Sequence, residues 1–428
     1  MNIVTSAKRL FSSLLSRNEK VFVFSAMACS FFISFEYAIT RPASDAIFLS
    51  LYTFKAFPIV WILVVPINFL VIHIYNRLLP RFGCLKLFTF IVLSIISINT
   101  FSAFFILNIK YLAFIQYICK DIYILLMFKQ LWSLIHTTVK QKNAKYLYGI
   151  IFGAGGIGAS LGSVTPSFFA VQMGSKNLFF FTVPIYALLF IGYFSALKTS
   201  RLIGASTSEE YKNDFDVAKK SFRSFFTSKY LVFILLIVVS MQVSISLVDY
   251  QFNYLMEKSI ALLDQRTQYM GRVHLLINIL TSVMQFFGAG ILLHYVGLKR
   301  THFFLPLFLC INAVLLIFFP IFGIASFVFI SIKSLDYSIF SISREMLYIP
   351  MNLEEKFRAK AVIDVFAYRT AKAIGSLLLL GLRYIFVLEV SYTLIGMLSV
   401  SLFIVWMIFV LFLFRHYRLR AEQYQTAH

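Results

Sequence analysis

The stretch REMLYIPMNLEEKFRAKAVIDVFAYRTAKAIGS, residues 344–376, lies between two segments made almost entirely of Phe, Ile, Leu and Val. It contains a short basic run and then enters another apolar segment while keeping three charged side chains. These three are Asp364, Arg369 and Lys372. A charge at the centre of a membrane-spanning helix costs about 2.5–3.5 kcal/mol, unless it lines a polar cavity or has a partner. We therefore expect this stretch to form the wall of a substrate path.

The composition indicates a membrane protein. Of 428 residues, 60% are hydrophobic, 18% aromatic and only 13% charged, which is too apolar for a soluble domain. A net charge of +21 would indicate nucleic acid binding in a soluble protein, but here the cations cluster between apolar segments. The four cysteines and the scattered His136, His274 and His294 show no metal spacing. We expect no cofactor, no metal and no nucleic acid partner.

The apolar segments predict an all-α integral membrane protein with twelve transmembrane helices. β-Barrel strands would alternate in polarity, and these segments do not. The predicted spans lie near residues 20–40, 55–76, 86–108, 112–137, 147–171, 177–197, 230–253, 270–295, 302–321, 325–347, 360–383 and 391–414.

The distribution of Lys and Arg predicts that both termini are cytoplasmic, because cations crowd alternate loops. The segment 198–229 is polar and is expected to link two six-helix halves. The predicted parts are a cytoplasmic N-terminal segment 1–19, a first half 20–197, the linker 198–229, a second half 230–414 and a cytoplasmic tail 415–428.

An internal repeat supports the two halves. Similar residues recur in the same order at separations of 213–215 positions, half the length of the chain. The matches are Glu36 with Asp249, Gly83 with Gly297, Asp121 with Asp336, Lys129 with Arg344, and Ala144-Lys145 with Ala359-Lys360. A parallel duplication of this kind is the architecture of the major facilitator superfamily.

The fourth and tenth spans each carry an acid and, eight residues later, a cation. Eight residues are a little over two helical turns, so each pair lies broadly on one face. Asp121 and Asp336 are expected near mid-membrane, with a role in gating or as structural partners of Lys120 and Lys333. Their cations, Lys129 and Arg344, would hold substrate near the cytoplasmic opening or extend their charge to the interface.

Four further charges allow two interpretations. Glu36 and Asp249 lie near the outer ends of their predicted spans, as coupling acids or as interfacial acids facing water. Arg369 and Lys372 share a face of the eleventh span and have no counterpart in the fifth. They would bind an anion, since Arg forks onto phosphate and Lys adds a point charge. The alternative is neutralisation by Asp364, Asp336 or Asp249.

The glycines of the fifth span, in IIFGAGGIGASLGS, lack the GK[ST] ending of a phosphate loop. We interpret Gly153, Gly155, Gly156, Gly158 and Gly162 as helix–helix contacts. The sequence also lacks a Ser–His–Asp constellation, so an enzyme is the weaker class.

The quoted stretch resembles a characteristic segment of the bacterial and plastid ATP/ADP translocases. The residues that match are Glu345, Tyr348, Ile349, Pro350, Lys360, Asp364 and Lys372. Three other segments are similar to the family: SLVDYQF around Asp249, AITRPASDAIFLS with Arg41 and Asp45, and AKYLYGIIFGAGG. Ser44 stands where the family usually has a lysine, and Thr137 where an acid is common.

The resemblance implies a nucleotide transporter of a bacterial inner membrane with a major-facilitator-like fold. The expected substrate-binding cations are Arg369, Lys372, Arg344, Lys129 and Arg41. The expected gating or coupling acids are Glu36, Asp121, Asp249, Asp336 and Asp364. The partners are a nucleotide or another anionic small molecule and the lipid bilayer, and we expect a monomer. The alternatives are a proton-coupled carrier of another organic anion or drug, and a non-transporting protein that kept the fold.

The predicted topology can be checked directly. Reporter fusions after Lys212 and at the C-terminus should both give cytoplasmic signals, because both follow an even number of spans. A periplasmic signal at either position would remove a span from the predicted twelve.

Overall fold

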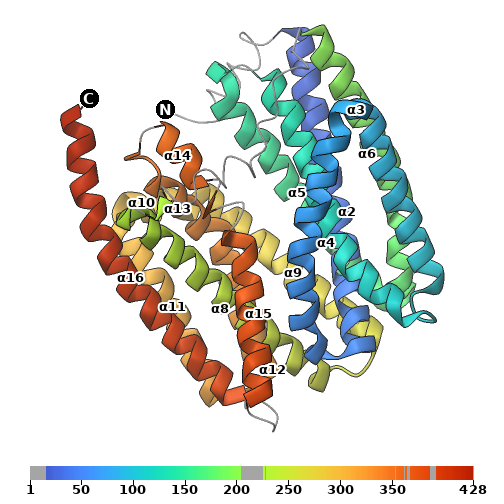
Figure 1. Cartoon of the computed structure of the whole chain (residues 1–428). Helices are drawn as coiled ribbons and strands as arrows, with labels where there is room; N and C mark the ends of the chain where they lie inside the picture. The colour runs from blue at the N-terminus through green and yellow to red at the C-terminus, as the bar shows by residue number, and fades with distance from the viewer. Residues whose placement is uncertain are drawn as a thin grey trace. The chain divides into compact units, whose positions relative to one another are not determined.

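The computed structural model describes residues 16–139, 141–203, 225–226, 228–351, 353–360, 362–363, 367–385 and 392–427. All regular structure in these ranges is helical (Figure 1). Ten helical stretches among the described residues are long and apolar enough to cross a membrane. The prediction of an all-α, multi-pass membrane protein is therefore confirmed.

The first part of the chain forms six longer helical elements and a short turn. These are α2 (Arg17–Tyr52), η2 (Phe54–Ala56), α3 (Phe57–Phe105), α4 (Lys110–Thr138), α5 (Gln141–Met173), η3 (Ser175–Phe181) and α6 (Thr182–Leu202). The second part contains α8 (Lys229–Ser259), α9 (Leu263–Val283), η4 (Met284–Gly288), α10 (Ala289–Tyr295), α11 (Leu298–Phe318), α12 (Phe322–Leu335), η5 (Asp336–Phe340), α13 (Ser341–Leu347), α14 (Leu353–Lys360), α15 (Tyr368–Ile385) and α16 (Tyr392–Ala427).

The chain divides into two compact units, each of which takes a short segment from the other part of the sequence. Unit 1 comprises Met1–Leu51, Ile67–Tyr211 and Ala261–Leu275. Unit 2 comprises Tyr52–Pro66, Lys212–Ile260 and Leu276–His428. The start of α3 thus belongs to unit 2, and the start of α9 to unit 1. Within unit 2, α8 packs against α12, α15 and α16 (Figure 1).

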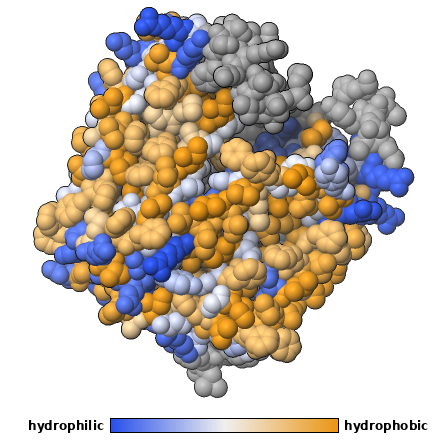
Figure 2. Space-filling view, turned by 180° about the vertical axis from the view of Figure 1, so that it is seen from behind, coloured by the Kyte–Doolittle hydropathy of each residue, from blue (hydrophilic) through white to orange (hydrophobic). Residues whose placement is uncertain are grey.

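The helices are apolar on almost all sides, so they can face lipid as well as each other. Phe24, Phe90 and Phe318 are 70%, 66% and 73% exposed, which would be costly in water but is favourable in hydrocarbon. Figure 2 shows hydrophobic side chains over most of the visible face. The helix α8 is different, because nearly every residue from Val238 to Asn253 is buried.

Two glycines separated by 214 positions adopt the same backbone conformation. Gly83 has φ 74° and ψ 164° inside α3, and Gly297 has φ 82° and ψ 159° before α11. An L side chain is strained at such φ values, which explains glycine at both places. At Gly83 this conformation divides the long run of α3 into two helical parts.

Glycines of α5 allow a close approach to α2. A Cβ added to Gly158 would lie 2.3 Å from the carbonyl oxygen of Phe31, and one added to Gly162 would lie 2.3 Å from that of Phe35. A Cβ at Gly155 would lie 2.7 Å from the Ser30 hydroxyl. The predicted role of the fifth-span glycines as helix contacts is confirmed at these three positions.

Three helices extend beyond the membrane spans predicted for them. The first helix does not end near residue 40, because α2 continues through Pro42 to Tyr52. The last helix does not end at 414, since α16 reaches Ala427. The predicted linker begins inside α6, which ends at Leu202, and its residues 204–224 lie outside the described ranges.

Two π-helical elements, η4 and η5, lie in unit 2, and the described residues 362, 363 and 367 of the same unit are also π-helical. The side-chain amide of Gln285 in η4 donates a hydrogen bond to the carbonyl oxygen of Tyr337 in η5, at 2.8 Å. Turns of this kind contain an extra residue and are frequent at functional sites.

The close contact of α5 with α2 predicts a steric effect. Gly158→Ala should lower the thermal stability of the purified protein in detergent, because the added methyl group overlaps Phe31; overpacking costs about 1–3 kcal/mol. The matched control is Gly149→Ala in the same helix, where a Cβ meets nothing within 4 Å. That control should keep or slightly raise the melting temperature. Equal behaviour of both variants would contradict the contact.

Candidate functional site

A buried ion pair joins α8 to α12 in unit 2. The Nζ atom of Lys333 lies 3.0 Å from Oδ2 of Asp249, and each side chain is only 8% exposed. Lys333 also lies over the ring of Phe329, 5.4 Å from its centroid. A charge at this depth is stable only when it is paired, so the ion pair fixes both helices to each other.

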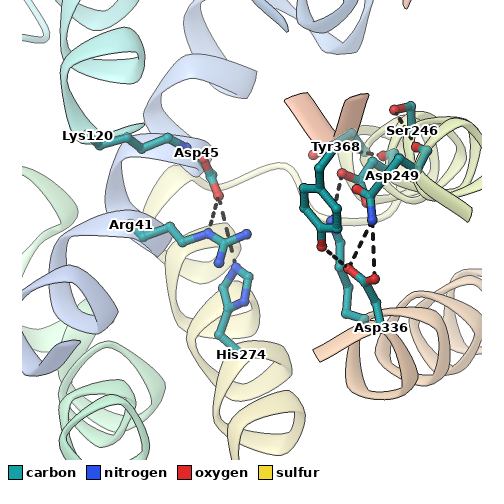
Figure 3. Close-up of polar contacts among 11 residues, drawn as sticks. Arg41, Asp45, Lys120, Ser246, Asp249, His274, Asp336 and Tyr368 are labelled. Atoms are coloured by element: carbon teal, nitrogen blue, oxygen red, sulfur yellow. Dashed lines mark hydrogen bonds and ion pairs between the residues drawn. The ribbon is translucent and has the colours of Figure 1, made fainter. Parts of the chain in front are cut away.

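A second acid of unit 2, Asp336, lies at the start of the π turn η5. Its carboxylate accepts hydrogen bonds from the Gln242 amide at 3.2 and 3.3 Å and from the Tyr368 hydroxyl at 2.6 Å (Figure 3). These donors come from α8 and α15, so Asp336 holds three elements together. The Tyr368 ring in turn contacts the guanidinium group of Arg344, at 5.6 Å from the centroid.

Lys372 follows Tyr368 by one turn on the same face of α15. Its Nζ atom lies 4.7 Å from the ring centroid of Trp61, at the start of α3. Lys372 is partly exposed, whereas Trp61 is 3% exposed. Near this point α15 approaches α8 closely, because a Cβ at Gly375 would lie 2.9 Å from that of Ser246.

Asp45 is the centre of the corresponding cluster in unit 1. It forms an ion pair with Lys120 of α4, lies 3.8 Å from Nε of Arg41 and 4.0 Å from Nε2 of His274 (Figure 3). Lys120 also lies 3.6 Å from the ring centroid of Tyr117. Arg41 and Asp45 are four residues apart in α2, which places them on one face.

Glu36 is fully buried in unit 1 among neutral polar groups. One carboxylate oxygen accepts hydrogen bonds from the Thr182 hydroxyl at 2.8 Å and the Asn99 amide at 3.3 Å. Asn99 accepts in turn from the Gln116 amide at 2.6 Å. Among the described residues no Lys, Arg or His forms an ion pair with Glu36, so this carboxyl depends on dipoles alone.

Several sequence-based expectations change in the structure. Lys120 and Lys333, suggested as partners of Asp121 and Asp336, form ion pairs with Asp45 and Asp249. Asp121 is partly exposed and has no hydrogen-bond or ion-pair partner among the described residues.

The alternative that Glu36 and Asp249 face water at an interface was also wrong, since they are 0% and 6% exposed. Lys129 lies over the Tyr75 ring, 5.8 Å from its centroid. Asp364 and the side chain of Arg369 lie outside the described residues, so their predicted roles stay predictions.

Sequence analysis named Asp45, Lys120 and Lys333 but not the contacts that they make, and it missed Tyr368 and Trp61 as members of these clusters. A signal was present for the lysines, because Lys120 and Lys333 are 213 positions apart, the same separation as Glu36 and Asp249. The 213-residue separation of the two lysines does not predict which acids they bind. Asp249 and Asp45 are not equivalent positions in the repeat, so the two lysines bind acids on different turns.

The two clusters share a chemical character. Cations within apolar helices lie against a carboxylate, an aromatic ring or both, in unit 1 and in unit 2. A carboxylate neutralises its lysine fully, whereas a ring only attracts it through its quadrupole. Lys372 and Arg344 contact the rings of Trp61 and Tyr368.

Two solved structures with a similar fold are those of transporters. The chain aligns with the POT family transporter PepTSo at a TM-score of 0.56 and 12% identity, over 95% of this chain and 98% of that one. It aligns with the nucleoside transporter NupG at a TM-score of 0.57 and 10% identity, over 92% and 99%. At such identities the likeness shows the fold alone. The class is an all-helical, multi-pass membrane protein whose fold is similar to that of these two solved structures.

The sequence model of the TLC ATP/ADP transporter family matches residues 178–329 and 321–417, more than half of the chain. The chain belongs to this family. It is 22% identical to ADP,ATP carrier protein 1 of Chlamydia pneumoniae over 187 residues, and 48% identical to ADP,ATP carrier protein 1 of Chlamydia trachomatis serovar D over 50 residues. These matches cover 39% and 12% of this chain, and 36% and 10% of the two carriers.

The ion pair of Asp249 with Lys333 predicts non-additive mutants. Asp249→Asn and Lys333→Met should each lower stability strongly, by about 3–5 kcal/mol, because each leaves a buried partner unpaired. The double variant should be less destabilised than the sum of the two. Thermal unfolding in detergent measures all three. Asp121→Asn serves as the control and should change little; additive effects would contradict a coupled pair.

Proposed function

We propose that this protein carries a nucleotide across a bacterial inner membrane in exchange for another nucleotide, by alternating access. Membership of the ATP/ADP transporter family supports the substrate class. The observation that carries the proposal is Lys372, a partly exposed cation within an apolar helix that contacts the ring of Trp61. A cation within an apolar helix such as α15 is expected in a protein that carries an anion across the membrane.

The proposed substrate contacts are cations that suit phosphate groups. Arg344 offers a planar fork that matches phosphate oxygens, and Lys372 offers a mobile point charge. We propose that three further cations attract the anion along its path. These are Arg369, which lies on α15 with Lys372, and Lys129 and Arg41 in unit 1. Phosphates are multiply charged, so they compete well with a neutral ring for an ammonium group.

The buried acids are proposed to act as gates or coupling groups. Asp249 and Asp336 tie α8 to α12, α15 and η5, as Asp45 ties α2 to α4. Rearrangement of a helix against its neighbour requires these contacts to break or to exchange partners. Asp121 and Asp364 are proposed to take part as alternative partners when they do.

The proposed architecture is twelve transmembrane helices in two six-helix halves. The ten apolar stretches include one of 52 residues, Phe54–Phe105, which Gly83 divides into two helical parts. The eighteen-residue α15 adds a further helix whose charges reduce its hydropathy. We propose halves at 20–197 and 230–414, a cytoplasmic linker at 198–229, both termini in the cytoplasm and a monomer.

A second candidate function is proton-coupled transport of another organic anion or drug. The observation that favours it is Glu36, a fully buried carboxyl held by Thr182 and Asn99 and by no described cation. An ionised carboxylate in such surroundings is costly, and binding a proton removes that cost. A proton bound at Glu36 could then travel with an anionic substrate.

Counterflow distinguishes exchange from proton coupling. Vesicles preloaded with unlabelled nucleotide should take up labelled nucleotide much faster than empty ones, because the loaded carrier covers its cations when it changes state. Lys372→Ala should reduce this counterflow more than Lys129→Ala does, since Lys372 lies within an apolar helix of unit 2 and directly contacts the anion.

Proton coupling predicts a different result in the same vesicles. Equal uptake into empty vesicles, driven by an imposed proton gradient, would contradict exchange and support the second candidate. In that case Glu36→Gln, which resembles the protonated acid, should lose gradient-driven uptake and keep counterflow. Its membrane abundance is the control for folding.

A further inference from the structure

Thr53, in the connection between α2 and η2, has a backbone conformation that residues other than glycine rarely adopt. Its φ is 65° and its ψ is 165°, and it is the one non-glycine residue with a positive φ among those that the structure describes. This region of backbone space is essentially restricted to glycine, because a Cβ atom is crowded there, and a β-branched side chain adds to the crowding. The connection is therefore strained at Thr53.

The side chain of Thr53 does not account for this conformation. It is exposed, and its hydroxyl group makes no hydrogen bond that caps η2. A strained residue persists only where the surrounding structure fixes it. The cause therefore lies in the residues on either side of Thr53.

The residues before and after Thr53 make contacts in different units. Before it, the Ser50 hydroxyl accepts a hydrogen bond from Nη1 of Arg266 at 3.0 Å, within unit 1. After it, the backbone N–H of Phe54 donates to the Glu257 carboxylate at 2.6 Å, within unit 2. The chain thus leaves unit 1 and enters unit 2 between Ser50 and Phe54, and Thr53 lies in this crossing.

The segment after Thr53 is docked on unit 2 by further contacts. The Phe54 ring packs edge-on against the rings of Tyr250 and Tyr254, with centroids 5.3 and 4.9 Å apart. Arg383 of α15 donates a hydrogen bond to the carbonyl oxygen of Lys55 at 3.2 Å. Together with Glu257, these side chains fix the position of η2 and can hold the neighbouring backbone in an unfavourable conformation.

The docked segment has a weak point at its other end as well. It ends at Pro66, inside α3, and the residues from Ile67 onward belong to unit 1. Proline lacks the N–H group of a helical hydrogen bond, so helices bend readily at this residue. Residues 54–66 are therefore bounded by a strained residue on one side and by an interrupted helical hydrogen bond on the other.

We propose that Thr53 is a strained hinge: docking of residues 54–66 on unit 2 forces its backbone into this conformation, and release of the segment relaxes it. This inference rests on the proposed transport by alternating access, in which helices must leave some of their neighbours. The strain raises the free energy of the docked state and so opposes the contacts with Glu257 and Arg383. The segment then leaves unit 2 more readily than its contacts alone would allow.

Glycine at position 53 removes the strain and keeps the contacts, because it adopts a φ of 65° without a Cβ atom. Thr53→Gly should raise the melting temperature of the purified protein in detergent by about 3 °C. Thr53→Ala keeps a Cβ atom and should give a smaller rise. The matched control is Asn108→Gly, in the exposed turn between α3 and α4, where φ is not positive. That control should lower the melting temperature, since glycine there only adds freedom to the unfolded chain.

Hydrogen–deuterium exchange of the peptide that contains Phe54, followed by mass spectrometry, measures release of the segment directly. The Phe54 amide donates to Glu257 in the docked state, so its exchange requires undocking. We expect Thr53→Gly to slow this exchange by about fivefold, because the docked state loses its strain. Glu257→Ala should accelerate the exchange, and Asn108→Gly should leave it unchanged. Unchanged or faster exchange in Thr53→Gly, or a lower melting temperature, would overturn the proposal.

Nucleotide counterflow in vesicles shows whether transport uses the hinge. If release of the segment belongs to the transport cycle, Thr53→Gly should slow counterflow by a similar factor at equal membrane abundance. Normal counterflow together with slower hydrogen exchange would overturn the role of Thr53 in transport and leave the transport function intact. If the unaltered protein exchanges no nucleotide, the proposed function fails, and hydrogen exchange still decides whether Thr53 is a strained hinge.

Discussion

A charge within a membrane-spanning bundle is stable only where a counter-charge or a polarisable ring covers it, and this constraint organises both units. Lys333 and Lys120 satisfy it with carboxylates, and Lys372 and Arg344 with the rings of Trp61 and Tyr368. The two solutions differ in strength. A carboxylate neutralises its lysine and fixes two helices to each other, while a ring attracts a cation only through its quadrupole.

The repeat predicted from the sequence gives two lysines equivalent positions, but the acids that they bind are not equivalent. Lys120 and Lys333 are 213 residues apart, yet their partners Asp45 and Asp249 lie at different depths in α2 and α8. Because Asp45 takes the lysine of unit 1, Glu36 at the position equivalent to Asp249 is left among neutral donors. One substitution of partner has therefore given the two units different electrostatics on similar helical frames.

Hydropathy and the positive charges between apolar segments were sufficient to predict an all-helical, multi-pass protein, because lipid imposes that pattern on every span. The first helix was predicted too short, since Arg41, Pro42 and Asp45 interrupt the apolar run as an exit would. The burial of Asp45 depends on Lys120, seventy-five residues away, which no local pattern reveals. Trp61 was missed for the same reason, as its partner Lys372 follows 311 positions later.

The π turn η5 has a geometric consequence for the residues that follow it. An α-helix advances about 100° around its axis for each residue, so one additional residue turns everything beyond it by that angle. Arg344 lies four residues after η5 and Asp336 at its first position. The extra residue thus rotates Arg344 about the helix axis and sets the direction from which its guanidinium group contacts the Tyr368 ring. Insertion of one residue into a helix is therefore enough to redirect a guanidinium group by about 100° around the helix axis.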